Sequence, residues 1–390
     1  MLNFNYCNKA NIIFGKKEEE NTGKYTAQFG KRVLLHYGMN SIKKTGLYDK
    51  IIKSLNDYNL EITELSGVKP NPVLSMVNKG IDICRKKNID IILAVGGGSV
   101  IDSAKAIAVG AALPEKENIW EYFMDKSKKI NNAINIGVVL TIPATGSESS
   151  TSCVITNEDG YYKRSIGTSA FIPKFSILNP ELTYTLPAYQ TACGCSDIIS
   201  HLMERYFTQV KNVDLTDRLI EASIKTVLIN GMYALKNPTD YNSRAEIMWT
   251  GTLAHNGLLN TGRIGDWASH YIEHELSGIY DIAHGAGLSI ITLAWIKYVY
   301  KENIDKFLQF AQRVFSIDII EDKEKAVFEM ICSLENWYNK MGLPTRLSHV
   351  NIDNSRFEEM AKKAMVAREH VGNFKKLYFD DIIKILELAL

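Results

Sequence analysis

The 390-residue chain lacks both a long apolar run and a cysteine framework. Its longest late apolar stretch, AGLSIITLAWI at 286–296, is much shorter than the roughly 20 residues that a helix needs to cross a bilayer. The opening residues MLNFNYCNKANIIFG contain no apolar core of the signal-peptide kind. Of six scattered cysteines, only Cys193 and Cys195 are close, and their spacing is not the usual one for zinc. We therefore expect a cytoplasmic protein with reduced thiols and no membrane segment.

The sequence also lacks an excess of charge of either sign. It has 45 Lys and Arg against 44 Asp and Glu, a formal net charge of +1. No global field would therefore attract nucleic acid or an anionic membrane, and we expect neither as a partner. With 46% hydrophobic and 23% charged residues, the composition is that of a globular protein, long enough for two domains with separate cores.

Proline is scarce in the second half, since seven of the nine prolines fall at or before Pro187. In residues 1–180, short apolar runs such as RVLLHYG and IDIILAVGGGS alternate with helical patterns. This alternation predicts a Rossmann-like α/β domain with a parallel sheet. In residues 181–390 long amphipathic segments dominate, so we expect an all-α second domain.

Two turns rich in small residues follow predicted strands in the first domain. Glycines at the first turn let backbone N–H groups approach phosphate oxygens, and the following helix start adds partial positive charge. The turn is not G-x-G-x-x-G, so a simple tight turn is the plainer alternative. The carboxyl ends of parallel strands share one sheet edge, however, and two such turns together favour a nucleotide site. The candidate cofactor-binding residues here are Gly96, Gly97, Gly98, Ser99, Asp102, Thr141, Thr145 and Ser147. For Asp102, a partner of the helix dipole is the alternative to a ligand contact.

In the second domain, acidic and imidazole side chains recur at helical spacing. Asp197 and His201 are four residues apart, as are His270 and His274, and His284 precedes a predicted helix start. Residues four apart share a helix face. One carboxylate with three imidazoles makes a ligand set for a divalent ion. The other histidines are assigned to the core or the surface: His36, His255, His349 and His370.

The stretch HYIEH at 270–274 also matches the H-x-x-E-H pattern of inverted zincin proteases. In that interpretation His270 and His274 bind zinc and Glu273 is the general base. It leaves the pair Asp197 and His201 and the glycine turn without a role. We keep the metallopeptidase as the weaker alternative.

Taken together, the motifs resemble the iron-containing alcohol dehydrogenase family, in particular its NADPH-dependent butanol dehydrogenase-like branch. The resemblance runs from YCNKANIIFGK to FKKLYFDDIIKILE and is carried by GGGSVIDSAK, TIPATGSE, GCSDIISHLME and HYIEHELSGIYDIAHGAGLSI. It implies a dehydroquinate synthase-like architecture, a dinucleotide in the α/β domain, a metal in the helical domain, and a homodimer. It also implies Asp197, His201, His270 and His284 as metal ligands, with His274 beside the metal. Two departures, Asn179-Pro180 for the common Asp-Pro and GCSD before Asp197, involve no proposed ligand.

The resemblance predicts hydride transfer between a nicotinamide and a small primary alcohol or aldehyde, such as butanol or butanal. A divalent ion polarises the substrate oxygen; Fe²⁺ is preferred, and Zn²⁺ or another ion is chemically acceptable. His274 is the candidate catalytic proton carrier, with a structural role as the alternative. Glu273, turned away from the ligand face, is expected to be a structural or solvated carboxylate. A non-catalytic nucleotide-binding protein is disfavoured because every proposed ligand is present.

The turn after RVLLHYG bears on the choice of cofactor. NAD enzymes usually place an acid there for the ribose 2′-hydroxyl, but Gly38 is followed by Met39, Asn40 and Ser41, with lysines nearby. Asn40 and Ser41 can donate to a 2′-phosphate, and a lysine can pair with it. The alternative is a surface turn with solvated lysines. We expect NADP(H), bound in part by Met39, Asn40 and Ser41.

Overall fold

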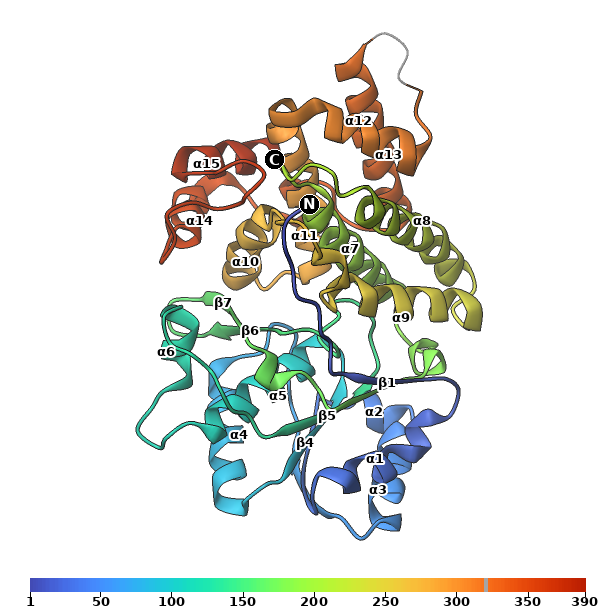
Figure 1. Cartoon of the computed structure of the whole chain (residues 1–390), viewed down its shortest axis with the longest axis vertical. Coiled ribbons are helices and arrows are strands. Elements are labelled where there is room, and N and C mark those ends of the chain that lie inside the picture. Colours follow the sequence, from blue (N-terminus) through green and yellow to red (C-terminus); the bar gives the residue numbers. More distant parts are fainter. Residues whose placement is uncertain (319–321) are drawn as a thin grey trace. The chain divides into compact units, whose positions relative to one another are not determined.

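The structure, a computed structural model, describes residues 1–318 and 322–390. The chain forms two compact units: Cys7–Leu186, and Pro187–Leu390 together with Met1–Tyr6 (Figure 1). The first residues are held on the helical unit, where the backbone N–H of Leu2 donates to the carbonyl of Gly262 over 2.9 Å. The division expected from the sequence, 1–180 and 181–390, therefore differs from these units at the N-terminus and over 181–186.

The α/β unit contains a six-stranded sheet in the order β1-β8-β5-β4-β2-β3, with every neighbouring pair parallel. The expected parallel sheet is confirmed. Its strands are β1 (Asn11–Phe14), β2 (Arg32–Tyr37), β3 (Glu61–Leu65), β4 (Ile91–Gly96), β5 (Asn135–Leu140) and β8 (Phe175–Leu178). A separate antiparallel hairpin consists of β6 (Ser152–Asn157) and β7 (Tyr162–Gly167).

Helices pack on this sheet and explain its apolar sequence. Every residue of β4 is buried, as expected for a strand covered on both faces. On one face, Leu35 and Leu93 pack with Ile51 and Leu55 of α3. The helices of this unit are α1 (Thr22–Thr26), α2 (Ser41–Lys44), α3 (Leu47–Asp57), α4 (Leu74–Lys87), α5 (Gly98–Ala112) and α6 (Ile119–Met124).

The second unit is helical, which confirms the expectation for this part of the chain. Its described residues contain no named strand, only an isolated bridge between Val371 and Leu377. The helices are α7 (Ala188–Tyr206), α8 (Asp214–Lys236), α9 (Tyr241–His255), α10 (Ala268–Tyr280), α11 (His284–Val299), α12 (Ile304–Phe315), α13 (Lys323–Lys340), α14 (Phe357–Ala364) and α15 (Phe379–Leu388). Short 3₁₀ turns in the chain span Glu18–Asn21, Ala27–Phe29, Ser169–Phe171, Pro180–Thr183, Leu258–Asn260, Tyr300–Asn303, Leu347–Val350 and Asn354–Arg356.

The apolar run at 286–296 lies within α11, which is buried along most of its length. A helix that is apolar on all sides belongs in a core or a membrane, and here it lies in the core of the helical unit. None of the described helices is both long and apolar enough to cross a membrane.

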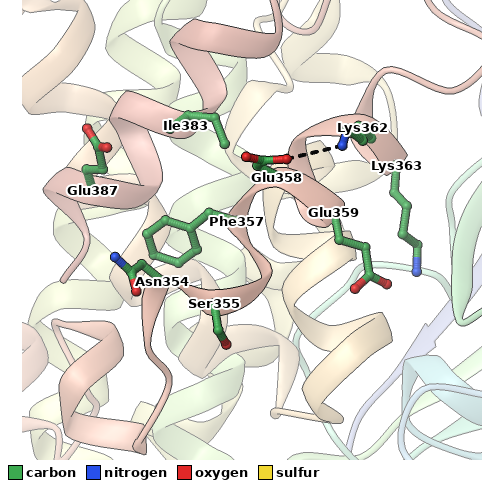
Figure 2. Close-up of a pocket in the computed structure, with 9 residues that line it drawn as sticks. All are labelled: Asn354, Ser355, Phe357, Glu358, Glu359, Lys362, Lys363, Ile383 and Glu387. Carbon is green, nitrogen blue, oxygen red and sulfur yellow. Dashed lines mark hydrogen bonds and ion pairs between the residues drawn. The ribbon is translucent and has the colours of Figure 1, made fainter.

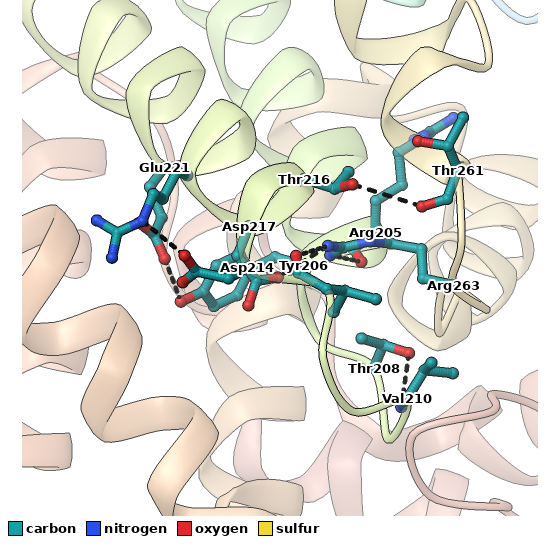
Figure 3. A network of polar contacts seen from close by, with 12 residues as sticks. Arg205, Tyr206, Thr208, Val210, Asp214, Thr216, Asp217, Glu221, Thr261 and Arg263 are labelled. Atoms are coloured by element: carbon teal, nitrogen blue, oxygen red, sulfur yellow. Dashed lines mark hydrogen bonds and ion pairs between the residues drawn. The ribbon is translucent and has the colours of Figure 1, made fainter. Parts of the chain in front are cut away.

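A buried ionic network ties the C-terminal end of α7 to its neighbours (Figure 3). Asp217 of α8 pairs with Arg263 over 2.9 Å, and the hydroxyl of Tyr206 donates to Glu221 over 2.8 Å. Arg263 also donates to the carbonyl of Arg205 over 3.0 Å. Removing one partner of such a buried pair would leave the other charge uncompensated, so we expect single substitutions in this network to destabilise the helical unit.

Candidate metal centre

Three imidazoles converge on one carboxylate oxygen inside the helical unit. Asp197 and His201 project from one face of α7, His270 comes from α10, and His284 begins α11. The Oδ1 atom of Asp197 lies 3.5 Å from Nδ1 of His201 and 3.8 Å from Nε2 of both His270 and His284. The first three residues alone form a buried group whose ligand-type atoms all lie within 4.8 Å of one another. The structure thus brings together the set expected from the sequence.

The unsatisfied atoms of this group indicate what it can hold. Asp197 Oδ1, His201 Nδ1 and His270 Nε2 are buried, and none has a hydrogen-bond partner within the described chain. Each such atom costs about 1–3 kcal/mol unless it binds something. Ligands of a tetrahedral ion, each about 2.1 Å from it, lie about 3.4 Å apart, close to the spacings around Asp197. One carboxylate oxygen with imidazole nitrogens therefore suits a divalent transition-metal ion.

Glu204 holds His270 from outside this group. Its Oε1 accepts from Nδ1 of His270 over 3.0 Å and from the backbone N–H of the same residue over 2.9 Å. Its Oε2 accepts from the backbone N–H of Trp267 over 2.5 Å. One carboxylate thus caps the start of α10 and orients the ring, so that Nε2 faces the other ligands. Glu204 had no assigned role in the sequence analysis, although it lies on the helix of Asp197.

Glu273 holds His284 in a similar way. It is fully buried, and its two oxygens contact Nδ1 of His284 and Oγ of Ser277. Gly287 of α11 lies so close that a Cβ there would be 2.5 Å from Oε1. Of the two expected roles, a structural or a solvated carboxylate, the structure favours the structural one, because α11 covers this flank of α10. With both oxygens engaged, Glu273 is poorly placed to act as the general base of a zincin.

His274 and His255 lie beside the centre. His274 is buried, and its ring centroid is 5.7 Å from that of His284, with which it shares a second group that also includes Glu273. His255, assigned to the core or the surface, has its ring centroid 4.4 Å from that of His201. α9 contains no candidate ligand, so the spacing of residues along it could not predict that His255 lies beside the centre. Only the packing of α9 near α7 places it there.

The buried surroundings act on the protonation of the ligands. Burial lowers the pKa of His201 well below its usual range, and the charges of His255 and His270 lower it further. Burial also lowers the pKa of His270, but hydrogen bonding and charge from Asp197 and Glu204 outweigh it and raise that pKa to about 9. A neutral His201 is the form that offers a nitrogen lone pair to a metal.

In the α/β unit, the two small-residue turns meet at one edge of the sheet. The backbone N–H of Thr141 donates to the carbonyl of Gly96 over 3.0 Å. A Cβ on Gly98 would lie only 2.4 Å from Oγ1 of Thr145. Gly97 is the N-cap of α5 and offers no side chain to its first N–H groups. The two turns therefore lie in direct contact at this edge of the sheet.

The turn after β2 lies next to these two turns in sheet order. β2 and β4 are neighbours in the sheet. The next strand in the chain after β2 is β3, which lies on one side of this pair, and the next after β4 is β5, which lies on the other side. Such a switch point is where open α/β sheets bind ligands. Met39, Asn40 and Ser41 are exposed there.

Asp102 and Ser147 bond to the protein itself. Asp102 is buried, and its oxygens accept from Oγ of Ser147 over 2.5 Å and from the backbone N–H of Val154 over 2.9 Å. They join α5 to the second turn and to β6. Their contact with a cofactor stays a prediction.

The structure also reveals an acid near the turn after β2. Glu64 of β3 accepts from the hydroxyls of Tyr37, over 2.6 Å, and Tyr48, over 2.8 Å. The ammonium of Lys43 lies over the rings of the same tyrosines, 5.5 and 4.7 Å from their centroids. The sequence does not reveal this acid, because Glu64 lies in β3 and not in the turn that directly follows β2.

A further pocket, of about 580 Å³, lies elsewhere in the helical unit (Figure 2). It is lined by residues of α14, α15 and the turn before α14, and the ion pair of Glu358 and Lys362 lies within it. None of the candidate ligands lines this pocket.

Comparison with known proteins identifies the family of the chain. Residues 9–180 match the family described as iron-containing alcohol dehydrogenase, and residues 191–390 match the C-terminal part of the Fe-containing alcohol dehydrogenase family. The chain therefore belongs to the iron-containing alcohol dehydrogenase family, whose members use a divalent metal and a nicotinamide cofactor. The resemblance to this family, inferred from the motifs, is confirmed.

Individual relatives cover nearly the whole chain. A probable NADH-dependent butanol dehydrogenase of Bacillus subtilis is 41% identical over 100% of both chains. An NADPH-dependent aldehyde reductase of Escherichia coli is 35% identical over 93% of each. The crystal structure of an NADH-dependent butanol dehydrogenase from Thermotoga maritima has a TM-score of 0.95 and 38% identity, and the match covers 100% of this chain and 99% of that one.

Proposed function

We propose that the protein is an iron-dependent, NADPH-linked enzyme that interconverts small primary alcohols and aldehydes, such as butanol and butanal. The observation that carries this proposal is the convergence of three imidazoles on the buried carboxylate of Asp197, with three ligand-type atoms left unpartnered. The butanol dehydrogenases and the aldehyde reductase among the relatives support the substrate class. The proposal includes a cytoplasmic homodimer with no nucleic-acid or membrane partner.

In this proposal Asp197, His201, His270 and His284 hold the ion. When bound, the ion supplies Lewis acidity at the substrate oxygen, and the nicotinamide supplies or accepts the hydride. Asp197 Oδ1 lies within 3.8 Å of a nitrogen of all three imidazoles, so the four side chains can share one cation. His274, beside His284, is assigned to carry the proton that the substrate oxygen gains or loses.

The cofactor is assigned to the α/β unit. The backbone N–H groups of Gly97, Gly98 and Ser99 donate to its phosphates. Asn40 and Ser41 donate to the 2′-phosphate that distinguishes NADPH from NADH. Both tyrosines already donate to Glu64, and the ammonium of Lys43 lies over the rings of the same tyrosines. These features support NADPH, while the relatives include enzymes named for either cofactor.

The metal assignment is tested by removing ligands one at a time. We expect Asp197→Ala and His270→Ala to lose the bound ion and butanal reduction while the far-ultraviolet circular dichroism is retained. Metal content is measured by elemental analysis after anaerobic loading with Fe²⁺. His349→Ala, an exposed histidine outside the centre, is the matched control and should keep both metal and activity. Full metal content and activity in both ligand variants would show that the assignment is wrong.

A further inference from the structure

Arg205 of α7 is a buried arginine whose guanidinium contacts few polar groups. It follows His201 by four residues, on the helix face that also carries Asp197. Its side chain is fully buried, and Nη1 donates to the carbonyl of His201 over 2.6 Å. Nε and Nη2 have no hydrogen-bond partner within the described residues. A carboxylate beside an arginine ordinarily accepts from two such nitrogens at once, and none does so here.

The other arginine near the end of α7 shows the more usual arrangement. Arg263 is also buried, but it pairs with Asp217 over 2.9 Å. Glu204, which precedes Arg205 in the chain, is engaged instead by His270. Burial lowers the pKa of Arg205 to about 9, which leaves the guanidinium charged at neutral pH. An uncompensated buried charge is costly, so the fold keeps a cation where stability alone would favour an apolar side chain.

Trp267 lies between this cation and the metal centre. The guanidinium is 4.6 Å from the centroid of its ring, and the same ring lies 6.1 Å from the His201 ring and 5.5 Å from the His270 ring. Trp267 has a φ of +71°, a left-handed conformation that is uncommon for a bulky residue. Its backbone N–H donates to Glu204 over 2.5 Å, which supports this conformation. Backbone strain of this kind collects at functional sites.

The charge of Arg205 reaches the candidate ligands. Arg205 lies one helical turn beyond His201 and two turns beyond Asp197, about 12 Å along the helix axis. Burial lowers the pKa of His201, and the charge of Arg205 is among those that lower it further. A cation held by Asp197 and His201 is therefore repelled by the guanidinium, and each further unit of charge on that cation increases the repulsion.

We propose that Arg205 keeps the iron of the metal centre in its divalent state. Oxidation of Fe²⁺ releases one electron, which dissolved dioxygen accepts to give superoxide, and the remaining Fe³⁺ carries one more positive charge. Because the guanidinium repels Fe³⁺ more strongly than Fe²⁺, it disfavours this step. At about 12 Å and an effective dielectric constant of about 20, one unit of charge changes the ratio of Fe³⁺ to Fe²⁺ about tenfold. The inference rests on the proposed function, since it requires iron at Asp197 and His201.

The test is the Fe³⁺/Fe²⁺ midpoint potential of the full chain after anaerobic loading with Fe²⁺. A redox titration follows the electron paramagnetic resonance of high-spin Fe³⁺. Arg205→Met should lower the potential, so that the ratio of Fe³⁺ to Fe²⁺ at a fixed applied potential is about tenfold higher. Arg205→Gln keeps an amide that can donate to the carbonyl of His201 and should lower the potential equally. Arg218→Met removes a 61% exposed arginine side chain of α8 and is the matched control, whose potential should be unchanged because solvent screens that charge.

A second measurement separates charge from structure. Both Arg205 variants should bind Zn²⁺ more tightly than the unmodified chain in competition with a chelator, because a repulsion has been removed; circular dichroism reports that they fold. An unchanged potential in both variants, with iron bound, would overturn this inference and leave the proposed function standing. A shift in Arg205→Met that is absent in Arg205→Gln would assign the effect to the hydrogen bond and overturn it too. An unmodified chain that held no iron would overturn the proposed function, and this inference with it.

Discussion

At the residue scale, the carboxylates behind the imidazoles matter as much as the ligands themselves. Glu204 and Glu273 each contact the Nδ1 atom of one candidate ligand and so fix which nitrogen is turned toward Asp197. Such partners raise the basicity of the imidazole and reduce the freedom that binding must remove. They explain why rings from three helices converge so closely.

The first prediction concerns Glu273. Glu273→Gln should weaken binding of Zn²⁺ or Co²⁺ about 10–100-fold, because the amide loses the charge that holds the His284 ring. Affinity is measured by competition with a chelator of known strength. Ser277→Ala removes one hydrogen bond to the same carboxylate but keeps its charge, and should have a smaller effect. Unchanged affinity in Glu273→Gln would show that the contact is only structural.

At the scale of elements, the start of α5 depends on the absence of side chains. Gly98 packs directly against Thr145. A larger residue at position 98 would therefore displace either the turn after β4 or the turn after β5. The glycines at this turn thus act through close approach, because Gly97 and Gly98 do not have positive φ.

Gly98→Ala tests this contact. The added methyl group should cost about 1–3 kcal/mol in the free energy of unfolding and weaken NADPH binding, because overpacking displaces the turn. Urea unfolding and a fluorescence titration with NADPH measure the two effects. Gly167→Ala in β7, where a Cβ would lie 3.5 Å from the nearest atom, is the control. If Gly98→Ala had the same free energy of unfolding as that control and the same affinity for NADPH, the contact between Gly98 and Thr145 would not explain the need for glycine.

The turn after β2 is predicted to select the cofactor. Met39 is 59% exposed, so a carboxylate placed there meets the ribose without disturbing the core. Met39→Asp should raise kcat/KM for NADH relative to NADPH, since the acid accepts from the 2′-hydroxyl and repels a 2′-phosphate. Met39→Asn, of equal size but uncharged, should shift the ratio little. A kcat/KM for NADH that equals or exceeds the NADPH value in the unmodified enzyme would contradict the assignment.

At the scale of the whole molecule, stability at low pH depends in part on one carboxylate at the start of the central strands. Arg32 hydrogen-bonds to Asp90 and, with the backbone N–H groups of Lys31 and Arg32, lowers the pKa of Asp90 to about 2. A depressed pKa stabilises the folded state above the unfolded value, about 3.9, and that contribution is lost as the pH falls toward 2.

Asp90→Asn should therefore be less stable than the unmodified chain at pH 6, by up to about 1 kcal/mol because the pair is partly exposed. The difference in free energy of unfolding should shrink as the pH falls from 4 to 2. Urea unfolding across this range provides the measurement. Asp57→Asn, which removes the exposed pair of Lys53 and Asp57, should have little effect at any pH. A difference that stayed constant with pH would contradict the role of Asp90.

The sequence by itself determined the order of the two units and the family. Alternating apolar runs and helical patterns suffice for a parallel sheet, because these periodicities are local. The pairs Asp197 with His201 and His270 with His274 could be placed on shared helix faces for the same reason. Small-residue turns after β4 and β5 were expected to meet because parallel strands end at one edge, and Gly98 does lie against Thr145.

Only the tertiary structure decided which other groups surround the centre. Glu204 and His270 are 66 residues apart in sequence, and no local pattern connects them. The sequence does not decide whether Glu273 is structural or solvated, because its own helix turns it from the ligand face and only packing against α11 buries it. His255, Glu64 and the N-terminal residues Met1–Tyr6 likewise take their positions from contacts with distant segments. Long-range packing joins residues whose spacing along the chain carries no period, and for that reason the sequence could not place them.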